Sequence, residues 1–149
     1  MTVGNICNRE VVITTRETPL IEVAKRMREY HVGDVVVVAE RGGERVPLGI
    51  ITDRDIVLSV IASEVNLHDL TAGDVMTPEL HTARERESIW DTMQQMRGHG
   101  VKRVPVVNDQ GGLVGILSVN DLLELISEEL LALAQVARRQ QQRERELRE

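Results

Sequence analysis

The feature of this sequence that most limits its fold is an internal repeat. Residues 32–38 (VGDVVVV) match residues 101–107 (VKRVPVV) at an offset of 69, and residues 49–55 (GIITDRD) match residues 115–121 (GILSVND) at an offset of 66. The first copy therefore has three extra residues between its valine run and its glycine, in a polar, glycine-containing stretch typical of a hairpin loop. The chain is a tandem duplication.

Each copy predicts the same order of elements, β-α-β-β-α. A short extended piece comes first, at residues 11–14 and 80–82, and a helix follows in which apolar residues recur every three or four positions. Thr18-Pro19 and Ser88 are good start signals for these helices. Two strands and a second helix then complete each copy.

The run of four valines at residues 35–38 indicates a strand that is buried on both faces. One copy alone would leave apolar surface exposed, whereas two copies stacked through their sheets would cover it. We therefore predict an α+β fold with two repeats, at residues 1–66 and 67–128. Pro105, inside the second valine run, indicates an edge or irregular position, because proline has no N–H to donate to a neighbouring strand.

Residues 121–149 form one long helical stretch without glycine or proline. The first half is strongly apolar and the part after Ala137 is polar. We expect residues 129–149 to be a solvated helical tail or a frayed helix end, since a fully polar segment buries little.

Composition excludes several classes of protein. The net charge of −6 and an aromatic content of 1% argue against a nucleic-acid-binding protein. The single cysteine excludes an internal disulfide framework, and the scattered histidines show no metal-ligand spacing. We expect no membrane segment and no secretory signal, and hence a cytoplasmic protein.

Two short strings carry the candidate chemistry, because each places a hydroxyl and a carboxylate three residues apart at a helix start. They are Thr52 with Asp55 and Ser118 with Asp121. A carboxylate suits the vicinal hydroxyls of a ribose, and a hydroxyl beside backbone N–H groups suits a phosphate. The alternative is that each string is only a helix cap and needs no ligand.

The two strings, together with residues 74–78 (DVMTP) and 104–107 (VPVV), resemble the motifs of a tandem pair of CBS (cystathionine β-synthase) domains, or Bateman module. The resemblance covers about residues 1–128. It implies a pseudo-twofold module with two clefts for adenosine ligands, usually AMP, ADP or ATP and sometimes S-adenosylmethionine or a dinucleotide. It also implies a homodimer that regulates another protein. Because this chain carries no enzyme or channel, it resembles the small stand-alone prokaryotic members.

The resemblance also implies how the site residues group. The cleft of Ser118 and Asp121 is completed by Arg103, Lys102, Cys7, Val12, Ile13 and Val32. The cleft of Thr52 and Asp55 draws on Met76, His81, Thr82 and Val101, with Arg54 as its only near cation. Arg103 aligns with Asp34 of the first copy, so the second cleft should hold phosphate better. The alternative is that Asp34 turns to solvent and pairs with a lysine or arginine, which leaves the two clefts alike.

We therefore predict a non-enzymatic sensor of AMP, ADP or ATP that acts through dimer assembly or through an unknown regulated protein. It requires no cofactor beyond this regulatory ligand. The sequence holds no P-loop, no metal-ligand carboxylate cluster and no nucleophile–base pairing. Two alternatives stay open: a structural dimerisation module with vestigial clefts, or a sensor of S-adenosylmethionine or NAD.

Overall fold

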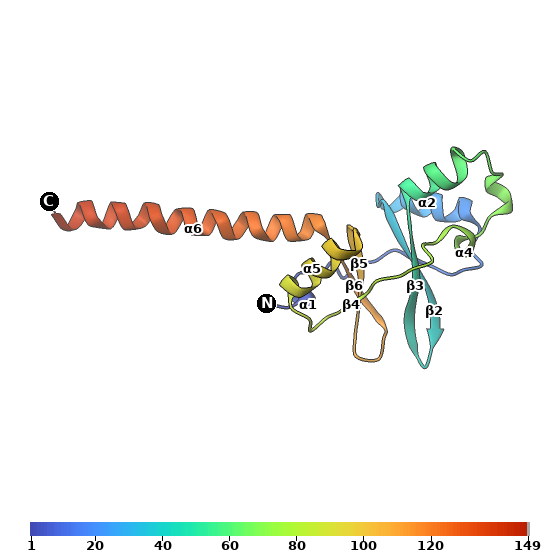
Figure 1. Cartoon of the computed structure of the whole chain (residues 1–149), viewed down its shortest axis with the longest axis horizontal. Helices are drawn as coiled ribbons and strands as arrows, with labels where there is room; N and C mark the ends of the chain where they lie inside the picture. Colours follow the sequence, from blue (N-terminus) through green and yellow to red (C-terminus); the bar gives the residue numbers. More distant parts are fainter. Residues whose placement is uncertain (149) are drawn as a thin grey trace. The chain divides into compact units, whose positions relative to one another are not determined.

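The computed structural model describes residues 1–148 and divides into two units, residues 1–117 and residues 118–149. The first unit holds the sheets, and the second is essentially one helix (Figure 1). Each unit is described by itself. Glu149, the end of the predicted tail at 129–149, lies outside the described residues.

Two three-stranded sheets with equivalent strand order form the centre of the first unit. The first sheet has the order β1-β2-β3, with β1 (Ile13–Thr14) parallel to β2 (Asp34–Arg41) and β2 antiparallel to β3 (Glu44–Thr52). The second has the order β4-β5-β6, built from β4 (Ala83–Arg84), β5 (Arg103–Val107) and β6 (Leu113–Ser118). This arrangement confirms the α+β fold of two repeats.

Helices follow the first strand of each sheet, as predicted. They are α2 (Leu20–Tyr30) and α5 (Ile89–His99), and the Ser88 hydroxyl caps α5 by accepting a hydrogen bond from the Trp90 N–H at 3.2 Å. The sequence did not predict several short turns of helix. These are α1 (Val3–Ile6), the 3-10 turn η2 (Leu67–Asp69) and α4 (Ala72–Val75). The second helix predicted for the first copy is α3 (Asp53–Ile56), which continues as the π-helical turn η1 (Val57–Ile61).

The second unit contains α6 (Val119–Arg148), a single unbroken helix (Figure 1). The predicted helical stretch is confirmed as far as Arg148. Residues 127–148 are exposed, and their helical hydrogen bonding continues through the polar half. The tail is therefore helical rather than frayed over the described residues.

The valines of β2 alternate between two apolar layers. Val35 and Val37 belong to the cluster that contains Leu20 and Val23 of α2. Val36 and Val38 belong to a second cluster, which also contains Ile50 and, from the other repeat, Ile116. The strand is thus buried on both faces, and its inner face packs against the second sheet. This confirms the predicted stacking of the two copies.

Pro105 does not lie on an edge strand, so the edge part of that prediction is wrong. It is fully buried in β5, the middle strand of the second sheet. The partner strand β4 has two residues and pairs only with Val106 and Val107. Because β4 stops short of Pro105, the missing N–H costs no hydrogen bond to that strand.

The first segment of each repeat packs on the other repeat. The N–H groups of Gly4 and Asn8 donate to the Glu85 and Ile116 carbonyls at 2.7 and 2.9 Å. In the same way, the Thr77 N–H donates to the Ile50 carbonyl at 3.0 Å. The glycines of the two repeat strings allow this close approach: a Cβ on Gly49 would lie 3.0 Å from Met76, and a Cβ on Gly115 would lie 2.7 Å from the Cys7 sulfur.

We expect Gly115→Ala to lower the free energy of unfolding by about 1–3 kcal/mol, the usual cost of overpacking a filled site. The new methyl group would also lie 2.9 Å from the Asn8 carbonyl oxygen, and backbone moves less easily than a side chain. Gly98→Ala in α5 is the matched control, because a Cβ there meets nothing within 4 Å and should stabilise the helix by up to about 1 kcal/mol. Equal effects of both changes in denaturant unfolding would contradict this account of Gly115.

Candidate functional site

A cavity of about 540 Å³ opens in the first unit, between the two repeats. Its volume falls within the usual range for small-molecule sites. Three segments line it: the end of β3 with α3, the linker before β4, and the chain that enters β5. The residues are Ile50, Thr52, Asp53, Arg54, Asp55, Thr77, Glu79, Leu80, His81, Gly100, Val101, Lys102 and Arg103.

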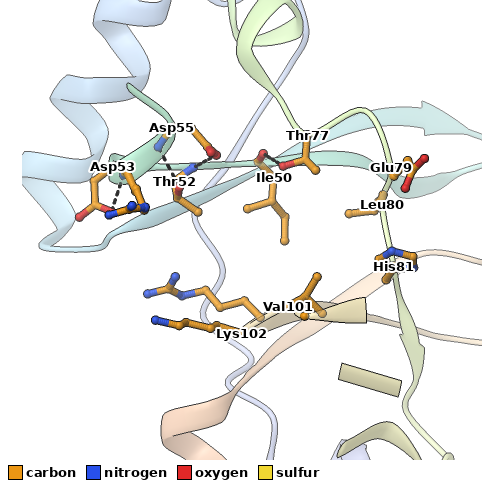
Figure 2. A pocket seen from close by; sticks show the side chains of 13 residues that line it. Ile50, Thr52, Asp53, Asp55, Thr77, Glu79, Leu80, His81, Val101 and Lys102 are labelled. Carbon is orange, nitrogen blue, oxygen red and sulfur yellow. Dashed lines mark hydrogen bonds between the residues drawn. The ribbon is translucent and has the colours of Figure 1, made fainter. Parts of the chain in front are cut away.

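Thr52 and Asp55 form a reciprocal helix cap at the start of α3. The Thr52 N–H donates to Asp55 Oδ2 at 2.9 Å, and the Asp55 N–H donates to Thr52 Oγ1 at 3.1 Å. The capping alternative is therefore real in this structure. It does not exclude a ligand, because a carboxylate has about four acceptor positions and this cap uses few of them. Figure 2 shows the pair on the cavity wall.

The cationic side of the cavity differs from our expectation. Lys102 and Arg103 line the same cavity as Thr52 and Asp55, so the prediction that Arg54 is the only cation near this pair is wrong. The reason is the stacking of the repeats, which places the start of β5 across from the end of β3. Figure 2 shows Val101 and Lys102 on the wall that faces Thr52.

Asp34 and Arg103, which are equivalent in the repeat, pair with each other. Arg103 Nε lies 3.4 Å from Asp34 Oδ1, and the side chain of Asp34 is only 19% exposed. Asp34 therefore pairs with an arginine, as the alternative expected, but it does not turn to solvent. The arginine that it pairs with lines the cavity of Thr52 and Asp55. The ion pair holds the Arg103 guanidinium at the cavity edge and offsets part of its charge.

The linker contributes residues that the sequence reasoning missed. Thr77 lies against β3, because its hydroxyl and its N–H both donate to the Ile50 carbonyl at 3.0 Å. Glu79 and Leu80 follow. His81, which was predicted for this cleft, also lines the cavity and stacks on His99 with ring centroids 3.7 Å apart. Thr77 follows Met76, which the sequence did assign to this cleft, so its position next to that residue was the available signal.

Met76 and Thr82, which were predicted for the cleft of Thr52 and Asp55, do not line this cavity. Apart from Lys102 and Arg103, the first-unit residues predicted for the other cleft lie elsewhere. Val12 and Val32 pack against the core of the first repeat, and Ile13 packs against the cluster between the sheets. Cys7 is buried beside Gly115, and Thr82 is exposed.

Ser118 and Asp121 lie in the second unit and form the same cap at the start of α6. The Ser118 N–H donates to Asp121 Oδ2 at 2.7 Å, and the Asp121 N–H donates to Ser118 Oγ at 3.2 Å. Their assignment to a cleft with residues of the first unit stays a prediction.

The family model for the CBS domain matches this chain twice, at residues 3–62 and 72–128. The chain belongs to the CBS domain family. Its two matches make it a tandem CBS pair, and the mixed fold with two three-stranded sheets agrees with the solved structures of such pairs.

Similar sequences and solved structures also place this chain among CBS domain proteins. An uncharacterized protein of Methanopyrus kandleri is 33% identical over 125 residues, which cover 84% of this chain and 62% of that protein. A CBS pair solved with 5′-methylthioadenosine and S-adenosyl-L-methionine is 26% identical, with a TM-score of 0.73 over 85% of this chain and 99% of the other. A CBS domain protein from Pyrobaculum aerophilum complexed with AMP is 27% identical, with a TM-score of 0.72 over 85% and 99% of the two chains. The chain thus spans less than two thirds of the Methanopyrus relative.

Residues 1–148, which the structure describes, lack two further features. No helix in this range is long and apolar enough to cross a bilayer. The same range holds no group of three or more histidine, cysteine, aspartate or glutamate side chains that could hold a metal ion.

Proposed function

We propose that this CBS pair is a non-enzymatic sensor that binds an adenosine ligand in the cavity between Asp55 and Lys102. One observation supports the proposal: the Asp55 carboxylate and the Lys102 ammonium group lie on facing walls of one cavity (Figure 2). The complexes of the two related CBS proteins, with AMP and with S-adenosyl-L-methionine, support the choice of ligand class.

Each part of an adenosine nucleotide has a matching set of residues in this cavity. The carboxylate of Asp55 accepts hydrogen bonds from ribose hydroxyls, and Lys102 and Arg103 bind phosphate oxygens. Ile50, Leu80 and Val101 offer aliphatic surface to the base, in a chain with no phenylalanine.

The balanced charge of the cavity lining is also compatible with a second class of ligand. Among the described residues that line it, Asp53, Asp55 and Glu79 balance Arg54, Lys102 and Arg103. Such a wall suits a zwitterionic or weakly anionic ligand as well as a nucleotide. S-adenosylmethionine is therefore the second candidate, and NAD the third. Binding of the ligand would change the assembly of the protein, a homodimer in this proposal, or its contact with a regulated protein.

The proposal predicts saturable binding of at least one of AMP, ATP, S-adenosylmethionine and NAD in calorimetric titrations of the full chain. Asp55→Asn should weaken that binding by about ten-fold or more, because it removes a charge-assisted acceptor. The asparagine keeps an oxygen for the Thr52 N–H, so the helix cap is preserved. Asp74→Asn, in the equivalent cap of α4, is the matched control and should leave affinity unchanged. If none of the four ligands binds, the structural-module alternative replaces the sensor.

A further inference from the structure

The helix α6 carries an apolar stripe along one face. Leu123, Ile126, Leu130, Leu133 and Ala137 follow one another at alternating spacings of three and four residues. This is the spacing at which one helix packs along another. Leu123, Leu130 and Leu133 are 56%, 61% and 67% exposed. A single helix cannot cover its own stripe, so the stripe needs an occupant.

The charges of α6 are separated along its length. Residues 119–129 contain four acidic residues and no basic one. Residues 130–137 contain no charged residue, and residues 138–148 contain five arginines and two glutamates. One helix therefore has an acidic half and a basic half with an uncharged apolar segment between them.

We propose that α6 pairs with α6 of a second copy of this chain in antiparallel orientation. A crossing near residue 133 places the uncharged segments together and each acidic half along the basic half of the other helix. In this register Glu129 of one copy lies near Arg138 of the other, and Glu124 lies near Arg143. A parallel pair would instead place acid beside acid and arginine beside arginine, which is unfavourable. Charge complementarity thus selects both the occupant and its direction.

Spin-label distances in the full chain test the orientation. The chain has one cysteine, so Cys7→Ala removes it and Gln142→Cys adds a label site in the basic half. Two labels at 142 in an antiparallel pair are separated by about 27 Å along the helix axis, at a rise of 1.5 Å per residue. Labels at Ala132→Cys, close to the crossing, should lie about 10 Å apart. A short distance at both sites would show a parallel pair and overturn the proposal.

Dilution with unlabelled chain separates a second copy from other occupants. The dipolar signal between the labels must weaken on dilution with unlabelled chain, because the two labels are on different chains. If no defined distance between chains is found at either site, α6 is solvated or is covered by its own chain or another protein, and the proposal fails.

Charge reversal tests the basis of the pairing. Changing Arg138, Arg139 and Arg143 to Glu makes both halves acidic, and we expect the association of α6 to weaken by at least about ten-fold. Changing Glu124, Glu128 and Glu129 to Arg in the same chain restores complementarity and should restore the 142–142 distance. Unchanged melting of the first unit serves as the folding control. If the variant with all six substitutions does not recover the distance between the labels at 142, charge complementarity is not the basis of the pairing.

Discussion

We expect Arg103→Ala to weaken the binding of ATP by about ten-fold or more, and Asp34→Ala to strengthen it or leave it unchanged. The two residues are ion-paired at 3.4 Å, and Arg103 lines the cavity. A bound phosphate would compete with the Asp34 carboxylate for the guanidinium. Arg103→Ala removes the guanidinium that would bind the phosphate. Asp34→Ala removes the carboxylate that competes for this guanidinium, which leaves it available for the phosphate.

Two controls separate the loss of a phosphate contact at Arg103 from the loss of one positive charge anywhere in the protein. Lys25→Ala removes a positive charge from α2, where Lys25 pairs with Glu22, and should not change the affinity for ATP. Adenosine without phosphate should bind Arg103→Ala and the wild type within about two-fold, if Arg103 contacts only phosphate. Equal losses of ATP affinity in Arg103→Ala and Asp34→Ala would show that the ion pair holds the cavity wall and does not bind phosphate.

The second large effect concerns the packing of the two repeats. Val36→Asp should lower the free energy of unfolding by more than about 4 kcal/mol, because it places an unpaired carboxylate between the two sheets. Val36 is fully buried in the cluster that contains Ile50 and Ile116. If the variant does not fold, Val36→Ala gives a measurable loss of about 2–3 kcal/mol in urea unfolding.

Val65→Asp is the matched control for this prediction. Val65 is 45% exposed, so the same substitution there should change stability by no more than about 0.5 kcal/mol. A comparable loss at Val36 and Val65 would mean that the inner face of the first sheet is not covered by the second repeat.

The two-repeat fold could be predicted because its signals are local and occur twice. A run of four valines in a strand has apolar side chains on both faces, so both faces must be covered to bury them. Val35 and Val37 are buried on one face, and Val36 and Val38 on the other. The start of α5 at Ser88 and the cap of α3 by Thr52 follow from side chains that bond their own backbone. These contacts depend on neighbours in sequence, so reading the sequence was sufficient.

His81 and Val101 line the cavity of Thr52 and Asp55, as predicted. The presence of Lys102 and Arg103 on the same cavity was not predicted, because it depends on how one repeat sits on the other. The stacking of the sheets places Arg103 beside Asp34 and on the cavity of Thr52, a contact that the sequence did not predict. The assignment of Arg103 to the cleft of Ser118 and Asp121 stays a prediction. No pattern along the chain records a contact between residues 69 positions apart. The edge position predicted for Pro105 was wrong for a related reason. No signal near Pro105 indicates that β4 pairs only with Val106 and Val107.

The most direct test of the account is an amide chemical-shift titration of the full chain with AMP. If the cavity is the ligand site, shifts should concentrate in three segments: residues 50–55, residues 77–81 and residues 100–103. The amides of Thr52 and Asp55 should be among the most affected, and residues 138–148 should not respond. Saturable shifts confined to other segments, or no saturable shifts with AMP, ATP or S-adenosylmethionine, would contradict the assignment of this cavity as an adenosine site.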